Sequence, residues 1–181
     1  MTSTAVQAPL ADDYNLPGIY PDGVAFSGGV DGDGFACSSN LLGNTLTWNG
    51  VKFDLGSASQ TNVISCEGQT ISLPAGNYSK LKMLAIGVNG AQADLSFTVH
   101  YSDDSTQSFK QSISDWASPD SNTGESTAMT MDYRLQTDGS HDENTYYLFG
   151  YSFDLKSGGT VKSLQLPDNS NVKVFAISLL P

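Results

Sequence analysis

Clusters of turn-forming residues recur along this chain at intervals that are too short for ordinary helices. Gly, Pro, Asn and Asp separate short apolar segments. An average α-helix needs about 11 residues, whereas an average strand needs about 5 or 6, so this spacing favours strands. No segment has convincing helical periodicity. The main clusters are Pro17-Gly18, Pro21-Asp22-Gly23, Gly28-Gly29, Asp31-Gly32-Asp33-Gly34, Asn49-Gly50, Pro74-Ala75-Gly76-Asn77, Asn89-Gly90, Ser102-Asp103-Asp104-Ser105 and Ser157-Gly158-Gly159.

Two pairs of alternating segments predict β-hairpins. Residues 46–48 and 51–55 flank Asn49-Gly50, a dipeptide that is typical of tight hairpin turns. Residues 95–101 and 106–113 alternate in the same way around a four-residue turn. In the first hairpin Trp48 shares a face with Leu46, so we expect the indole to pack inward. Further strands are predicted over residues 81–88, 146–155, 161–166 and 172–180.

Many short strands with regular turns predict an all-β fold. The expected architecture is an antiparallel two-sheet β-sandwich of jelly-roll, galactose-binding-like type, formed by residues 14–181 as a single domain. Residues 1–13 are polar with small apolar side chains, and they are predicted to be a flexible N-terminal segment. The N-terminus lacks a charged and apolar leader, so no signal peptide is predicted. The sequence contains no run of 18 apolar residues, so no membrane span is predicted.

Charge and composition exclude several classes of partner. The formal net charge is −11, from 19 acidic and 8 basic residues. Binding to nucleic acid requires a basic surface that neutralises phosphates, so neither a nucleic acid nor an anionic membrane is an expected partner. The charge is compatible with neutral or cationic ligands, with bound calcium, or with solubility alone.

The two cysteines and two histidines limit metal and disulfide chemistry. Cys37 and Cys66 are too few for a four-thiolate zinc site, and they either form one disulfide or are two buried thiols. A histidine-rich zinc or iron site is not expected. His100 lies in an alternating strand, where a solvent-facing position is the simplest interpretation.

Three aspartates are candidate ligands for a structural calcium ion. The run Asp31-Gly32-Asp33-Gly34 alternates oxygen donors with glycines that let a chain wrap around a hard cation, and Asp22 is a third donor. The run lacks the closing glutamate of a helical calcium loop. The alternative is an ordinary glycine-rich turn.

Two dipeptides, Asp115-Trp116 and Tyr133-Arg134, predict a shallow sugar-binding site. An aromatic ring stacks on the apolar face of a pyranose, while Asp or Arg hydrogen-bonds its hydroxyl groups. The alternative is that Trp116 anchors the edge of the core while Asp115 and Arg134 form a structural ion pair. The aromatic strand around Tyr151 has one core face, and an exposed tyrosine there would line the same groove.

Catalytic signatures are absent from the sequence. No serine nucleophile elbow, phosphate loop or metalloprotease motif is present. A glycosidase needs two carboxylates on either side of its substrate, and the loop candidates are Asp115, Glu125, Asp142 and Glu143. With 19 acidic residues some pair is always found, so isolated loop carboxylates are the simpler interpretation.

Short motifs spread over nearly the whole domain resemble an accessory β-sandwich domain of secreted bacterial glycosidases and peptidases, notably those of acidobacteria and actinobacteria. One departure is Asp104, at a hairpin position where that family usually has Gly. The resembling segments are 14–19, 46–53, 73–76, 87–92, 97–103, 114–116, 133–134, 147–151 and 160–167.

The resemblance implies a secreted or extracellular carbohydrate-binding domain that is linked covalently to a catalytic domain. Our leading hypothesis is therefore a non-catalytic module that binds a polysaccharide or glycan through aromatic stacking and polar contacts. The alternatives are a small jelly-roll enzyme that cleaves glycans with loop carboxylates, and a structural or adhesion spacer.

Overall fold

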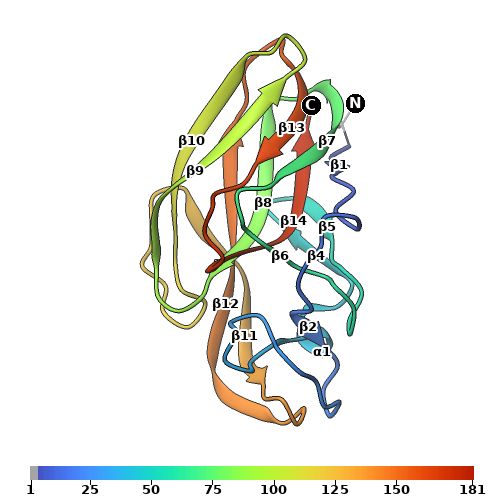
Figure 1. Cartoon of the computed structure of the whole chain (residues 1–181), viewed down its shortest axis with the longest axis vertical. Coiled ribbons are helices and arrows are strands. Elements are labelled where there is room, and N and C mark those ends of the chain that lie inside the picture. The colour runs from blue at the N-terminus through green and yellow to red at the C-terminus, as the bar shows by residue number, and fades with distance from the viewer. Residues whose placement is uncertain (1–3) are drawn as a thin grey trace.

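The computed structural model describes residues 4–181 and is built almost entirely of strands (Figure 1). The elements are β1 (Val6–Gln7), β2 (Ile19–Tyr20), β3 (Cys37–Ser38), α1 (Ser39–Leu42), β4 (Thr45–Trp48), β5 (Val51–Asp54), β6 (Ile64–Ser65), β7 (Thr70–Asn77), β8 (Lys80–Gly87), β9 (Gln92–Tyr101), β10 (Thr106–Ile113), β11 (Glu125–Leu135), β12 (His141–Asp154), β13 (Thr160–Gln165) and β14 (Val172–Leu180). The helix α1 has only four residues. In the described part of the chain, no helix is long and apolar enough to cross a membrane.

Two antiparallel sheets form the body of the molecule. The six-stranded sheet has the order β1-β14-β8-β12-β11, with β6 also paired to β14. The four-stranded sheet has the order β10-β9-β13-β7. Two small pairs are added, the β4–β5 hairpin and the parallel pair β2–β3. The predicted all-β, antiparallel sandwich is confirmed.

The central strands β8 and β14 of the six-stranded sheet are buried on both faces. All of β8 after Lys80 and all of β14 before Leu180 is buried. One face packs on the four-stranded sheet, where the Phe153 ring lies 5.8 Å from Phe97 and 5.0 Å from Phe109, measured between ring centroids. The other face is covered by the N-terminal layer, which we define as residues 4–66. Figure 1 shows β9 and β10 on one side of β8 and the β4–β5 hairpin on the other.

The β4–β5 hairpin forms as predicted, and it carries the predicted inward tryptophan. Asn49 and Gly50 both have positive φ, as a tight hairpin turn requires. Trp48 lies directly on Gly150 of β12, where a Cβ atom would come within 2.3 Å of the indole. Glycine is therefore required at position 150 because the indole occupies the space of a side chain.

The N-terminal segment differs from the prediction of a flexible tail over residues 1–13. Val6 and Gln7 pair with Leu179 and Ser178 of β14, and the Ala8 N–H donates to the Ile177 carbonyl at 2.9 Å. Ala8 and Leu10 are buried. The short segment docks because the edge of β14 offers unpaired backbone groups to it. Residues 1–3 lie outside the described part of the chain.

Both cysteines are buried free thiols, so of the two alternatives the disulfide does not form. Burial raises the pKa of the Cys66 thiol to about 12 and raises that of Cys37 as well. Both therefore remain neutral and unreactive in the native fold.

Candidate functional site

Trp116 is a core residue and not a sugar-stacking platform. Only 2% of its surface is exposed, and its ring centroid lies 5.0 Å from that of Tyr146. Its N–H donates to the Gly87 carbonyl at 2.9 Å, and its carbonyl accepts from the Tyr147 N–H at 2.8 Å. These backbone contacts draw the residue inward between β8 and β12. The predicted stacking role of Trp116 is therefore wrong, because no ring face is open to a ligand.

Arg134 is held by two carboxylates and three aromatic rings, which together we call the Arg134 cluster. Its Nε donates to Asp142 Oδ2 at 2.7 Å, and its Nη1 lies 3.5 Å from Asp31 Oδ2. Its guanidinium carbon lies 3.3 Å from the centroid of the Phe35 ring. Arg134 is therefore structural, with Asp142 and Asp31 in place of the Asp115 partner that the sequence suggested. The other two rings are those of Tyr146 and Trp116.

Asp115 caps a turn beside the Arg134 cluster. Its Oδ2 accepts from the Gly90 N–H at 2.7 Å, and its Oδ1 accepts from the Ala117 N–H at 2.8 Å. Both carboxylate oxygens of Asp115 thus accept from backbone N–H groups, and this turn-capping role accounts for an aspartate here without a ligand.

Tyr133 does belong to a partly exposed polar cluster, but this cluster ties the loop at Asp22 to strands β3, β11 and β12. Its hydroxyl donates to Asp22 Oδ2 at 2.6 Å, and its ring stacks on His141 with a centroid distance of 3.6 Å. His141 Nε2 lies 3.0 Å from the same Asp22 oxygen, and Ser38 Oγ also donates to Asp22. Burial alone raises the pKa of Asp22, but the hydrogen bonds from Ser38, Tyr133 and His141 outweigh it and leave that pKa below 3.8.

Tyr151 is fully buried, so its predicted place in a ligand groove is wrong. Its hydroxyl donates to Glu125 Oε2 at 2.5 Å, and Glu125 also accepts from the backbone and hydroxyl groups of Ser114. Burial and the Glu125 carboxylate both raise the pKa of Tyr151. The inward direction follows from β12, because its alternate residues 149, 151 and 153 face the four-stranded sheet.

The three candidate calcium ligands do not fit a cation site. Asp31 Oδ1 accepts from the N–H groups of Asp33 and Phe35, and its Oδ2 faces Arg134. Asp22 is used by the cluster around Tyr133, and the Asp33 side chain is exposed. Among residues 4–181, no three His, Cys, Asp or Glu side chains are grouped as metal ligands. Hard cations need several oxygens converging on one point, whereas the oxygens of Asp22 and Asp31 already accept from other donors.

The candidate catalytic carboxylates are also separated by their partners. Glu125 is bound by Ser114 and Tyr151, and Asp142 by Arg134 and Tyr146. Glu143 faces His141. A glycosidase needs an acid and a second carboxylate facing one sugar, and these groups face different neighbours.

The stabilising role of Asp142 predicts loss of stability in acid. Hydrogen bonds from Arg134 and Tyr146 hold the pKa of Asp142 below its ordinary 3.8. A carboxylate with a lowered pKa stabilises the fold fully above about pH 4. This stabilisation is lost as the pH falls through the lowered pKa. We therefore expect Asp142→Asn to lower the melting temperature at pH 7, and the gap from wild type to shrink below pH 4. Thermal unfolding from pH 2.5 to 7 measures this, with Asp33→Asn as the exposed control. A gap that stays constant with pH contradicts it.

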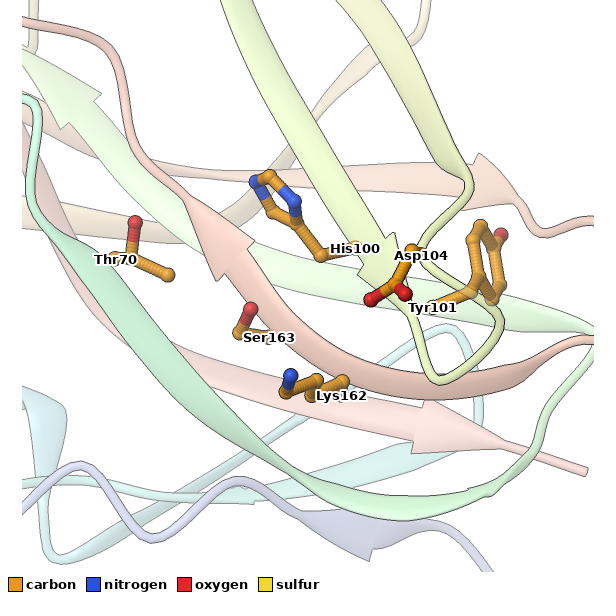
Figure 2. Close-up of a pocket in the computed structure, with 6 residues that line it drawn as sticks. All are labelled: Thr70, His100, Tyr101, Asp104, Lys162 and Ser163. Carbon is orange, nitrogen blue, oxygen red and sulfur yellow. The ribbon is translucent and has the colours of Figure 1, made fainter.

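A different site lies on the outer face of the four-stranded sheet, where side chains surround a hollow of about 180 Å³ (Figure 2). We call it the sheet-face hollow. The side chains come from three adjacent strands and one hairpin turn: Thr70 of β7, His100 and Tyr101 of β9, Asp104 of the β9–β10 turn, and Lys162 and Ser163 of β13.

The polar groups of the sheet-face hollow are free of internal partners. Ser163 is the cross-strand neighbour of His100. Throughout the described chain, the side chains of Thr70, His100, Asp104, Lys162 and Ser163 make no hydrogen bond or ion pair with protein. Tyr101 lines the floor, but it is 1% exposed and its hydroxyl donates to Gln107. The hollow therefore offers donors and acceptors without an aromatic platform.

A serine, a histidine and an aspartate thus share one hollow, yet nucleophilic catalysis is not favoured. A nucleophile needs its base within about 2.6–3.2 Å, and no hydrogen bond joins Ser163 to His100. A tetrahedral oxyanion needs free N–H donors. Ser163 and His100 lie inside paired strands, where the backbone N–H groups are used by the sheet.

The fold and the hollow together define a β-sandwich domain with a polar hollow on one outer face. The chain belongs to the family of AziU2-like β-sandwich domains, whose sequence profile matches residues 5–181. No curated protein sequence matches the chain. One similar solved structure is a carbohydrate-binding module from Cellvibrio mixtus lichenase 5A in complex with cellotriose, with 13% identity and a TM-score of 0.31 over 100% of this chain and 98% of that one. At that TM-score the likeness carries no functional argument.

Proposed function

We propose that this domain is a non-catalytic carbohydrate-binding module whose site is the sheet-face hollow. The observation that carries the proposal is the group of five polar side chains that have no protein partner. Hydroxyl, imidazole and ammonium groups donate, and carboxylate and hydroxyl oxygens accept, which suits the paired donor and acceptor character of sugar hydroxyls. Four of these groups lie on the paired strands β7, β9 and β13, so the backbone positions from which they project are fixed.

The site favours hydrogen bonding over the aromatic stacking that the sequence suggested. A volume of about 180 Å³ is below the roughly 300 Å³ at which pockets for drug-sized ligands begin. It suits one sugar unit and buries little area, so we expect dissociation constants of about micromolar to millimolar.

Variants of the hollow test the proposal. We expect His100→Ala and Lys162→Ala each to weaken glycan binding about five- to tenfold, because each removes hydrogen bonds to the ligand. The melting temperature should stay within a few degrees because both groups lack protein partners. Binding is measured on a glycan array and then by calorimetry. The matched control is Thr47→Ala, at an exposed position of β4.

The other outcomes separate the alternatives. Wild-type protein that binds no glycan on the array overturns the proposal and favours a structural or adhesion spacer. Release of reducing ends that a single Asp or Glu substitution abolishes favours the glycan-cleaving enzyme. The linked catalytic domain and the secreted location are proposals that rest on the family resemblance, and the surrounding reading frame tests them.

A further inference from the structure

Two rows of side chains cross the entire four-stranded sheet on its outer face. The strand register places Thr106, His100, Ser163 and Ser72 side by side as the first row. The second row, two residues further along each strand, consists of Ser108, Thr98, Gln165 and Thr70. All eight are exposed or half-buried, and the residues between the rows face the core. The sheet-face hollow, lined from β7, β13 and β9, is thus part of a longer track that continues onto β10.

The track is neutral in an acidic protein. Its eight residues include no Asp, Glu, Lys or Arg, although the chain has 19 acidic residues and a net charge of −11. Charged groups stand beside the track at the hollow, where Asp104 and Lys162 provide one of each sign. A polyanionic ligand would meet the net negative field of the domain, whereas a neutral ligand would not.

Hydrogen-bonding capacity along the track is largely unused. Thr98 Oγ1 and Ser108 Oγ are 2.8 Å apart and satisfy each other. No other side chain of the two rows bonds to a protein group in the described residues. All of these side chains except His100 and Gln165 are Ser or Thr, so few bulky groups obstruct a ligand that lies along the track.

We infer that the ligand is a linear, neutral glycan chain that crosses the strands along these rows, with one sugar unit in the hollow and its neighbours on the adjacent strands. The inference rests on the proposed function and names its substrate class. Four strands span three interstrand spacings, about 14 Å in total, which accommodates about three pyranose units in an extended chain. The track ends at the edge strands β10 and β7, so the site recognises internal segments of a chain that extends past both edges.

The dependence of affinity on chain length tests this inference. Cello-, xylo-, manno- and malto-oligosaccharides of one to five units are titrated against the whole domain by NMR chemical shifts. For at least one series we expect affinity to rise at least tenfold from one to three units and then to level off. Oligogalacturonides of the same lengths should bind more weakly. Equal affinity for the monosaccharide and trisaccharide, or preference for the oligogalacturonides, overturns the inference and leaves the proposed function standing. Absence of binding in every series overturns the proposed function itself.

Variants at the two ends of the first row locate the chain. We expect Thr106→Ala combined with Ser72→Ala to weaken trisaccharide binding about tenfold and to leave monosaccharide binding unchanged. Thr47→Ala is again the control, and a melting curve checks that the double variant folds. An equal loss for both ligands, or no loss for either, shows that the chain does not follow this row.

Discussion

Replacing Trp116 by alanine is expected to lower the free energy of unfolding by about 3–5 kcal/mol, as for other large aromatic side chains in protein cores. The indole is 2% exposed and packs on Tyr146 beside the guanidinium of Arg134. Alanine would leave a cavity that the hydrogen-bonded strands around it cannot fill. Chemical denaturation followed by tyrosine and tryptophan fluorescence and by circular dichroism gives the value.

The conservative change separates packing from ligand stacking. Trp116→Phe retains most of the apolar contact and should cost less than half as much. Under conditions where the variants remain folded, glycan binding should be unchanged, because Trp116 does not line the sheet-face hollow. A stable Trp116→Ala protein that has lost glycan binding would restore the stacking role that the structure argues against.

Replacing Arg134 by methionine is expected to cost about 3 kcal/mol, because it leaves two carboxylates of the Arg134 cluster without their cation. The side chain of Asp31 is only 5% exposed, and that of Arg134 is 19% exposed. Methionine preserves apolar contact with Phe35 but provides neither the charge nor the Nε donor. Urea denaturation at neutral pH measures the loss.

Two control variants show where that cost originates. Arg134→Lys keeps the charge but loses the planar stack on Phe35 and the Nε bond, so an intermediate loss is expected. Lys80→Met removes an exposed ion pair with Asp154 and should change stability by no more than about 1 kcal/mol. If Arg134→Met is as mild as Lys80→Met, the Arg134 cluster does not stabilise the fold more than an exposed ion pair does.

The strands with clear alternation were predictable from the sequence. The hairpins β4–β5 and β9–β10 alternate between apolar and polar residues, and the turn of the first is an Asn-Gly pair. Their side chains face the apolar core on one side and water on the other, so apolar and polar residues alternate in the sequence.

Two long strands were missed for identifiable physical reasons. Pro74 to Asn77 was interpreted as a turn, but it lies within β7, an edge strand that tolerates proline because one side needs no N–H donor. Strand β11 was not predicted because register shifts interrupt it between Thr127 and Met129 and between Met131 and Tyr133. Each shift changes the face of the following residues and destroys the alternation.

The predicted sugar site failed because neighbours in sequence do not reveal which face a side chain occupies. Trp116 and Tyr151 both point inward, where they are 2% and 0% exposed. The hollow instead joins residues 70, 100, 104, 162 and 163, which become adjacent only through the pairing of β7, β13 and β9. His100 was expected to face solvent and lies half-buried on that outer face, and its alternating strand was the one available signal.

The position of β14 between β1 and β8 governs the order in which the molecule can assemble. Val6 pairs with Leu179, and the same strand completes the edge of β8. Strand pairs between segments so far apart in the chain close long loops, which is entropically costly and slows folding. On the ribosome, β1 and β8 therefore wait without their shared neighbour until β14 has been synthesised. During that interval the apolar strands of the central sheet are exposed, which makes the time before β14 emerges the period of greatest risk of misassembly.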